Sequence, residues 1–269
     1  MNSEQLAWRM RCHAIDMVHN SHASHIGAVL SVVDILAVLY ANILKYDSKN
    51  PGMDERDRVI LSKGHAGVAM YAVLAECGYF PIEDLNSYYK DGSSYSGHIS
   101  HVGVPGVEFS TGSLGHGISV GCGIAISAKI QNKKFRVYAI VGDGECEEGV
   151  VWETALIASH RKLDNFTVIV DHNHMQAMGN CKDISAIEPM QDKWKAFGFE
   201  VINVADGNSH DQLYSAFTAE NHGRPKCIIA NTVKGKGISF MENQLKWHYS
   251  DPQGEFYELA KHELEEAHI

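Results

Sequence analysis

Short apolar runs bounded by turn residues recur along the chain and predict the strands of one sheet. They cover residues 59–61, 137–141, 166–170, 199–204 and 226–230. Between the second and third runs, Val151, Ala155 and Ala158 fall at the i, i+4, i+7 spacing of a helix. A strand, helix, strand unit implies neighbouring parallel strands joined by a right-handed crossover. The pattern therefore predicts an α/β fold built on a parallel sheet.

Helical spacing and turn signals divide the rest of the chain. We expect helices over 5–18, 31–44 and 209–220, and others beginning near Ala66, at 111–117 and near Glu147. Gly27 suggests a loop before the second helix, and the tail at 255–269 is expected to be a solvated helix. Residues 88–110 are rich in Gly, Ser and Pro and are expected to form a long loop.

Two polar turns leave consecutive predicted strands. One is Gly142-Asp143-Gly144 and the other contains Asn173. Each taken singly is more typical of an ordinary turn than of a site. Together, at the carboxyl ends of adjacent parallel strands, they offer a carboxylate and an amide oxygen to one ligand. Such hard oxygen donors suit Mg²⁺, and the two glycines let the backbone approach a bound group.

The same stretch carries a family resemblance. The sequence resembles transketolases, which use thiamine diphosphate. The resemblance lies in the GDG turn, in the later Asn and in the segment EEGVVWETALIASHRKLDNFTVIVDHN. The resemblance implies a parallel-sheet thiamine diphosphate-binding fold with helices on both faces. It also implies that Asp143, Asn173 and the Met175 carbonyl hold Mg²⁺ or another divalent cation such as Ca²⁺ or Mn²⁺. The second box has one Asn where many members have two.

Four histidines lie in boxes that resemble transketolase motifs. His25 follows Ser24 where the family usually has Gly, His65 lies in SKGHA, His98 follows Gly97, and His248 follows Trp247. The resemblance implies that His25 and His248 contact the substrate and that His65 and His98 assist proton movements. An alternative for the first box is a zinc site, because His19, His22 and His25 recur every third residue, but no acidic or Cys ligand lies at a recognised spacing.

Further boxes complete the expected cofactor site. Residues 111–117 resemble the TG-x-LG-x-G box, whose backbone meets the cofactor, and 231–237 lack the P-loop pattern but resemble a T-x-K-G-x-G loop. Glu148 matches a carboxylate at the interface between paired cofactor sites. The cofactor-binding residues implied by the resemblance are His65, Gly112, Ser113, Leu114, Gly142, Asp143, Gly144, Asn173 and His248.

Composition narrows the function classes. The 269 residues carry a net charge of −10, which argues against a nucleic-acid partner, since that needs a basic surface. The six cysteines are scattered without a C-x-x-C pair, which favours reduced thiols and a cytoplasmic protein. The most apolar stretch, 28–41, contains Asp34 and is too short to predict a membrane span.

The resemblance covers nearly the whole chain but only the diphosphate-binding part of a transketolase. We expect one domain over 1–269, with the pyrimidine-binding and C-terminal domains on a separately encoded C-terminal subunit in an α2β2 heterotetramer. The expected activity is transfer of a two-carbon ketol unit from a ketose phosphate to an aldose. Three alternatives stay open: a modified, for example sulfonated, ketose donor; the α subunit of a 2-oxoacid dehydrogenase; and a noncatalytic nucleotide-binding module.

Overall fold

Five parallel strands form the centre of the molecule. The structure is a computed structural model that describes residues 1–185 and 187–267. Across the sheet the strands lie in the order β1 (Arg58–Leu61), β2 (Val137–Gly142), β3 (Phe166–His172), β5 (Lys226–Asn231) and β4 (Glu200–Val204). All neighbouring pairs are parallel. The register pairs Gly142 with Asp171, so the two polar turns leave β2 and β3 at nearly the same level.

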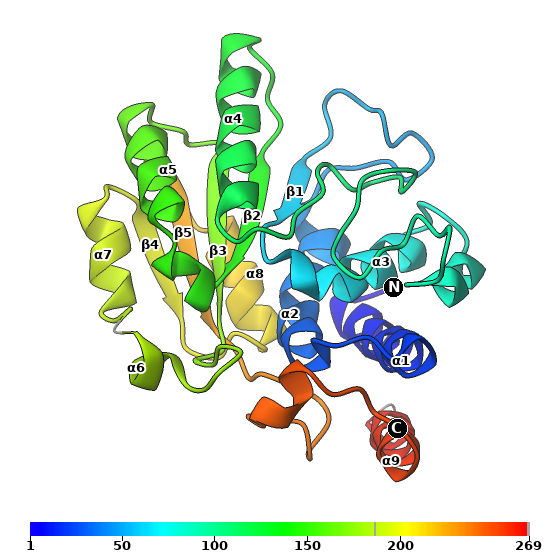
Figure 1. Cartoon of the computed structure of the whole chain (residues 1–269). Helices are drawn as coiled ribbons and strands as arrows, with labels where there is room; N and C mark the ends of the chain where they lie inside the picture. The colour runs from blue at the N-terminus through cyan, green and yellow to red at the C-terminus, as the bar shows by residue number, and fades with distance from the viewer. Residues whose placement is uncertain (186, 268–269) are drawn as a thin grey trace.

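Helices cover both faces of this sheet (Figure 1). On one face lie α1 (Ser3–Ser21), α2 (Ile26–Val38), α3 (Gly67–Glu76) and α8 (His210–Thr218), which share one apolar core with the sheet. On the other lie α4 (His116–Ile130), α5 (Gly149–His160) and α7 (Met190–Ala196), which share a second core. A strand that is buried on both faces needs apolar side chains along its whole length. This explains the continuous apolar runs of β2, β3 and β5. The expected α/β class is confirmed.

The second helix differs from its expected bounds. All residues of α2 are buried, and it continues into a π-helical turn at Leu39–Ile43. It begins at Ile26 rather than at 31, because Gly27 is not a loop residue: a Cβ there would lie 3.3 Å from the Trp247 carbonyl oxygen. The segment Ile26–Ile43 is long and apolar enough to cross a membrane, but 83% of it is buried inside the fold. It is a core helix by its packing.

Other helix boundaries also shift. The helix expected at 111–117 starts only at His116, after Gly115 at φ 81°. A short 3-10 turn, Gly144–Glu147, precedes α5, so the helix expected near Glu147 begins at Gly149. The expected solvated tail is wrong in part: α9 (Glu255–Glu266) buries Ala260 and Leu264, and residues 268–269 lie outside the described part of the chain.

The remaining elements are short. They are α6 (Cys181–Ile184) and 3-10 turns at Gly64–Ala66, Ile82–Ser87 and Leu245–His248. The segment 88–110 contains no helix or strand among its residues, all of which the structure describes, so the expected long loop is confirmed. The turns at Gly64–Ala66 and Leu245–His248 and part of the 88–110 loop contribute to the cavity described next, at the carboxyl edge of the sheet.

Candidate active site

One cavity of about 280 Å³ opens at the carboxyl ends of β1, β2 and β3. Loops from both halves of the chain line it, as expected for a parallel sheet. Its lining comprises His25, Ala28, Lys63, His65, His98, Gly112, Leu114, Gly142, Asp143, Gly144, Glu145, Asn173, Met175, Gln176, Ala177, Lys234 and His248. The structure thus brings all four expected histidines and all three expected metal ligands to one place.

The expected metal ligands form an oxygen-rich wall. Asp143 and Asn173 are 2% and 5% exposed, yet both line the cavity. One carboxylate oxygen of Asp143 accepts the Gly144 N–H at 2.8 Å and the other accepts the His174 N–H at 2.6 Å. The Asn173 side chain donates to Ser31 at 3.3 Å, so its amide oxygen is the atom left for a ligand or for the Met175 N–H at 3.2 Å. Backbone contacts therefore fix both side chains, and the donor set fits a hard cation.

Two buried lysines and an aspartate were not among the expected site residues. Lys63 Nζ forms an ion pair with Asp171 and donates to the Ala28 carbonyl at 3.2 Å. Lys234 Nζ donates to the Gln176 carbonyl at 3.1 Å and lies 3.1 Å from His248 Nδ1. The signal for both was in the sequence, as a lysine inside each of the Gly-rich boxes at 62–67 and 231–237. They supply positive charge next to the oxygen-rich wall.

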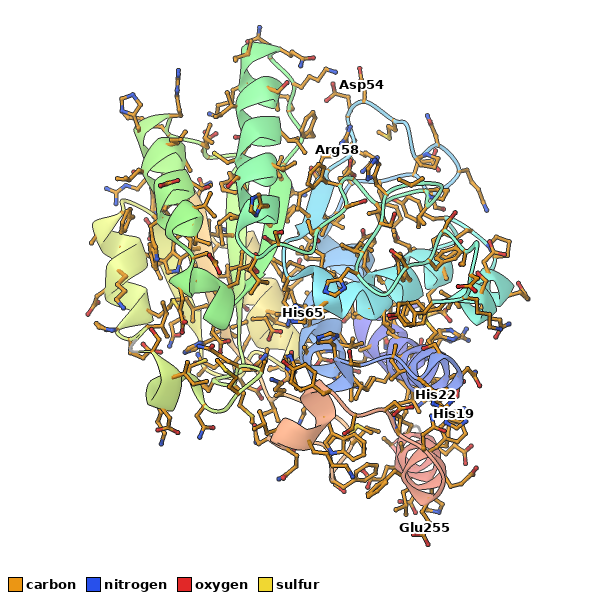
Figure 2. The ribbon with its side chains drawn as sticks, in the orientation of Figure 1. His19, His22, Asp54, Arg58, His65 and Glu255 are labelled. Carbon is orange, nitrogen blue, oxygen red and sulfur yellow. The ribbon has the colours of Figure 1, made fainter. Side chains whose placement is uncertain are left out.

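The four histidine rings cluster around His25. Its ring centroid lies 5.0 Å from that of His248, 5.2 Å from His65 and 5.8 Å from His98. His25 has a left-handed backbone, φ 75°, and its N–H donates to the His248 carbonyl at 2.8 Å, which links the first helices to the last loop. Figure 2 shows His65 near the centre of the molecule, between the sheet and the N-terminal helices.

The environment keeps three of these imidazoles neutral. Burial, helped by His98, lowers the pKa of His25 to about 4, and burial with Lys234 lowers the pKa of His248 to about 3. Burial and Lys63 also lower the pKa of His65 well below its usual range. Burial lowers the pKa of Lys234 to about 8. Near neutral pH His25, His65 and His248 are therefore uncharged imidazole donors and acceptors rather than cations.

A buried carboxylate organises the glycine turns. Glu145 accepts the Gly115 N–H at 2.7 Å and the Gly142 N–H at 3.0 Å, and it also accepts from Ser62. It thereby ties the box at 111–117 to the GDG turn, a role that the sequence analysis missed. A Cβ at Gly142 would meet no atom closer than 4.0 Å, so the cavity leaves room beside this backbone.

Not every expected residue lines the cavity. Gly112 and Leu114 do, but Ser113 is exposed and is absent from the lining, and Glu148 is exposed at the start of α5. The alternative zinc site at the first box does not form. His19 stacks on Tyr257 at 3.7 Å and His22 pairs with Asp251 at 2.9 Å, so both lie near α9, away from His65 (Figure 2).

Comparison with known proteins identifies the family. The family described as "Transketolase, thiamine diphosphate binding domain" matches residues 2–263. The chain belongs to the transketolase family. Its expected place in that family, the N-terminal diphosphate-binding part, is confirmed by this match.

The relatives of this chain are of two kinds: transketolase subunits of similar length, and transketolases that are much longer. The chain is 42% identical to the "6-deoxy-6-sulfo-D-fructose transketolase subunit SqwG" of a Clostridium strain, over 90% of this chain and 88% of that one. It is also 42% identical to one of the apulose-4-phosphate transketolase subunits of Actinobacillus succinogenes, over 98% and 96%. Human transketolase is 37% identical over 89% of this chain, but the chain spans only 38% of that enzyme.

Solved structures agree with the fold of this transketolase domain. Transketolase from Campylobacter jejuni superposes with a TM-score of 0.91 at 32% identity, over 98% of this chain and 43% of that one. The enzyme from Leishmania mexicana gives 0.86 at 30% identity, over 100% and 45%. The chain thus spans less than half of these full-length enzymes.

Proposed function

We propose that this chain is the N-terminal subunit of a two-subunit transketolase that moves a two-carbon ketol unit from a ketose to an aldose. The observation that carries the proposal is the single cavity in which Asp143, Asn173 and the four histidines meet. The match in length supports the split: the chain spans 96% of the apulose-4-phosphate transketolase subunit but 38% of human transketolase. A separately encoded C-terminal subunit would supply the rest.

Asp143, the Asn173 amide oxygen and the Met175 carbonyl would hold Mg²⁺, or Ca²⁺ or Mn²⁺ in its place. They are hard oxygen donors on one wall of the cavity, and the Met175 carbonyl receives only a long contact of 3.4 Å from Lys234 among the described residues. The ammonium of Lys234 would add positive charge for the cofactor diphosphate. Gly112, Leu114 and the GDG backbone would lie against the cofactor, and Ser113 would reach it only through its backbone.

Thiamine diphosphate would supply a nucleophilic carbon and an electron sink for the cleaved sugar. The histidines would position and polarise the sugar. His248 Nδ1 accepts from Lys234, which places a proton on the other ring nitrogen, free to donate to a substrate oxygen. His25 Nδ1 lies 2.9 Å from Ser24 Oγ, and this contact orients its ring. His65 and His98, whose ring centroids lie 5.2 and 5.8 Å from that of His25, would assist proton movements.

Partner and substrate follow from the relatives. The proposed assembly is an α2β2 heterotetramer, in which exposed Glu148 lies at the interface between paired cofactor sites, and the whole chain acts as one domain. Since one relative is named for a sulfonated fructose and another for apulose-4-phosphate, the proposed donor is a ketose with an anionic group at the end remote from the carbonyl. All six cysteines are free thiols, which favours a cytoplasmic enzyme.

The proposal is tested by reconstitution. The purified chain with Mg²⁺ should bind thiamine diphosphate only weakly, and ketol transfer should appear when the candidate C-terminal subunit is added. Donors with a terminal phosphate and a terminal sulfonate should be compared with an uncharged ketose. Transfer at full rate by the chain alone would disprove the split site. Turnover of pyruvate with the partner, in place of any ketose, would favour a 2-oxoacid dehydrogenase subunit instead.

A further inference from the structure

A second group of ligating side chains lies at the end of β3, outside the cavity just described. His172, His174 and Glu188 each offer one ligand atom, and these atoms lie within 4.8 Å of one another. His172 Nε2 is 2.8 Å from Glu188 Oε1, and the two imidazole rings lie 4.0 Å apart between centroids. Three donors therefore converge without any contribution from the four histidines of the cavity.

These side chains face a separate opening. A cavity of about 390 Å³ is lined by them together with Asn180, Cys181, Lys182 and Ile187, none of which lines the first cavity. The segment 172–175 is shared between the two cavities: residues 173 and 175 line the first, and residues 172 and 174 line the second.

We propose that His172, His174 and Glu188 bind a divalent transition metal ion of the zinc class. Two imidazoles and one carboxylate form the three-ligand set with which proteins hold zinc while leaving a fourth position for water. Mg²⁺ and Ca²⁺ are disfavoured, because imidazole nitrogen is not a hard oxygen donor. The buried Cys181 lines the same cavity, but the converging ligand atoms are those of His172, His174 and Glu188.

The geometry requires only a small closure. Zinc bonds of about 2.0–2.2 Å bring the ligand atoms of a tetrahedral site to about 3.4 Å from one another. His172 is held in place with 4% of its side chain exposed, and Glu188 Oε1 already lies 2.8 Å from its Nε2, so these two atoms need only separate slightly. The other carboxylate oxygen of Glu188 accepts the Met190 N–H at 2.7 Å, which holds Glu188 beside His172. The site is therefore built on His172 and Glu188, which His174 joins.

The site also explains an unpaired atom. His172 Nδ1 is buried and has no hydrogen-bond partner among the described residues, although Asp143 Oδ2 lies 3.5 Å away. A metal ion on Nε2 leaves the proton on Nδ1, which then donates to Asp143 Oδ2 and completes a carboxylate, histidine, metal chain. The outer ion would thereby orient Asp143. This effect on Asp143 concerns the proposed function, but the outer ion itself does not depend on that function.

The test uses Co²⁺ as a spectroscopic probe for zinc. The full chain is freed of metal, saturated with Mg²⁺, and titrated with Co²⁺ while visible absorption and heat are recorded. We expect one equivalent to bind in the presence of Mg²⁺. His174→Asn and Glu188→Gln should each weaken Co²⁺ binding by about tenfold or more. Asn is chosen at position 174 because it tolerates the observed φ of 64°.

Two controls decide where the ion binds. His262→Gln removes an exposed histidine that lies 3.6 Å from Glu266 and should leave the affinity unchanged. His25→Gln tests the inner histidines and should also leave it unchanged. No Mg²⁺-resistant Co²⁺ binding by the wild type, unchanged affinity in His174→Asn or in Glu188→Gln, or loss in His25→Gln would each overturn the proposal. Thiamine diphosphate binding, measured separately, tests the proposed function independently.

Discussion

The molecule contains two histidine clusters, which line two cavities at the carboxyl edge of the sheet and have different surroundings. The inner cluster around His25 faces Lys63 and Lys234, and burial with these cations lowers its pKa values. In the outer cluster burial also acts to lower the pKa of His172, but the carboxylates of Asp143 and Glu188 outweigh it and raise that pKa. The inner imidazoles thus face cations, whereas two carboxylates face His172. In the outer cluster too, burial and His172 lower the pKa of His174.

The difference has a structural cause. Asp143 lies between the clusters, with its carboxylate held by the Gly144 and His174 N–H groups. The charge of Asp143 acts on both clusters, while Asp171 compensates the charge of Lys63 within the sheet. Two chemically distinct sites can therefore share one sheet edge because the carboxylates are placed between the cations and the outer imidazoles. Removing single charges should break this arrangement.

Removing Lys63 should have the largest effect. Its side chain is 2% exposed and that of Asp171 is fully buried, so Lys63→Met would leave a buried carboxylate without its cation. We expect the free energy of unfolding to fall by about 3–5 kcal/mol. Urea unfolding measures this, with Lys129→Met as the control, since that lysine forms an exposed pair with Asp164 and should change little. A loss of stability no larger than in the control would show that the charge of Asp171 is compensated in another way.

Asp143→Asn should affect the cofactor most. The change keeps the shape but removes the charge shared by the two sides, so we expect binding of thiamine diphosphate with Mg²⁺ to weaken about a hundredfold, the upper range for groups that support a metal. Titration calorimetry on the complete two-subunit enzyme measures the change. Asp164→Asn, at an exposed aspartate, serves as the control. Equal affinity in the two variants would contradict the metal role of Asp143.

The pH dependence of stability should reveal the lowered pKa values of the inner cluster. An unfolded histidine has a pKa of about 6.5, whereas folding holds the pKa of His25 at about 4 and that of His248 at about 3. Between these values the unfolded chain binds protons that the folded chain does not, so stability falls as pH drops from about 6.5 to 4. Each imidazole contributes at most about 1.4 kcal/mol per pH unit, and less because both rings are partly open to solvent.

Unfolding by urea at pH 7 and pH 5 checks this slope. The variant His25→Gln/His248→Gln should lose less stability between the two pH values than the wild type does. His116→Gln, at an exposed histidine, should keep the wild-type slope. Parallel slopes in the wild type and the double variant would show that these rings titrate normally in the folded chain.

Local signals made much of this molecule predictable. The strands, the parallel order around β2 and β3, and the meeting of Asp143 with Asn173 follow from short apolar runs that end in polar turns. What escaped prediction depends on contacts between distant segments. Gly27 appeared to be a loop residue because its packing partner, the Trp247 carbonyl, is far along the chain. The pairing of Lys63 with Asp171 was missed for the same reason.

The smallest expected effect concerns Ser24, where the family usually has Gly. Its hydroxyl lies 2.9 Å from His25 Nδ1, and this contact orients the His25 ring. Ser24→Ala removes one hydrogen bond, worth about 0.5–1.5 kcal/mol, so ketol transfer by the assembled enzyme should slow by about two- to tenfold. Ser239→Ala, which removes a hydroxyl bonded to Glu263 far from the site, is the matched control.

The pattern of the Ser24→Ala kinetics distinguishes two roles for the hydroxyl. If it orients His25 for the sugar, KM and kcat should both change, and Ser24→Thr should restore them because the hydroxyl returns. If it only supports the left-handed backbone of His25, stability should fall while the kinetics stay constant. Unchanged kinetics in Ser24→Ala would mean that burial and the neighbouring contacts alone keep the His25 ring in position, without the Ser24 hydroxyl.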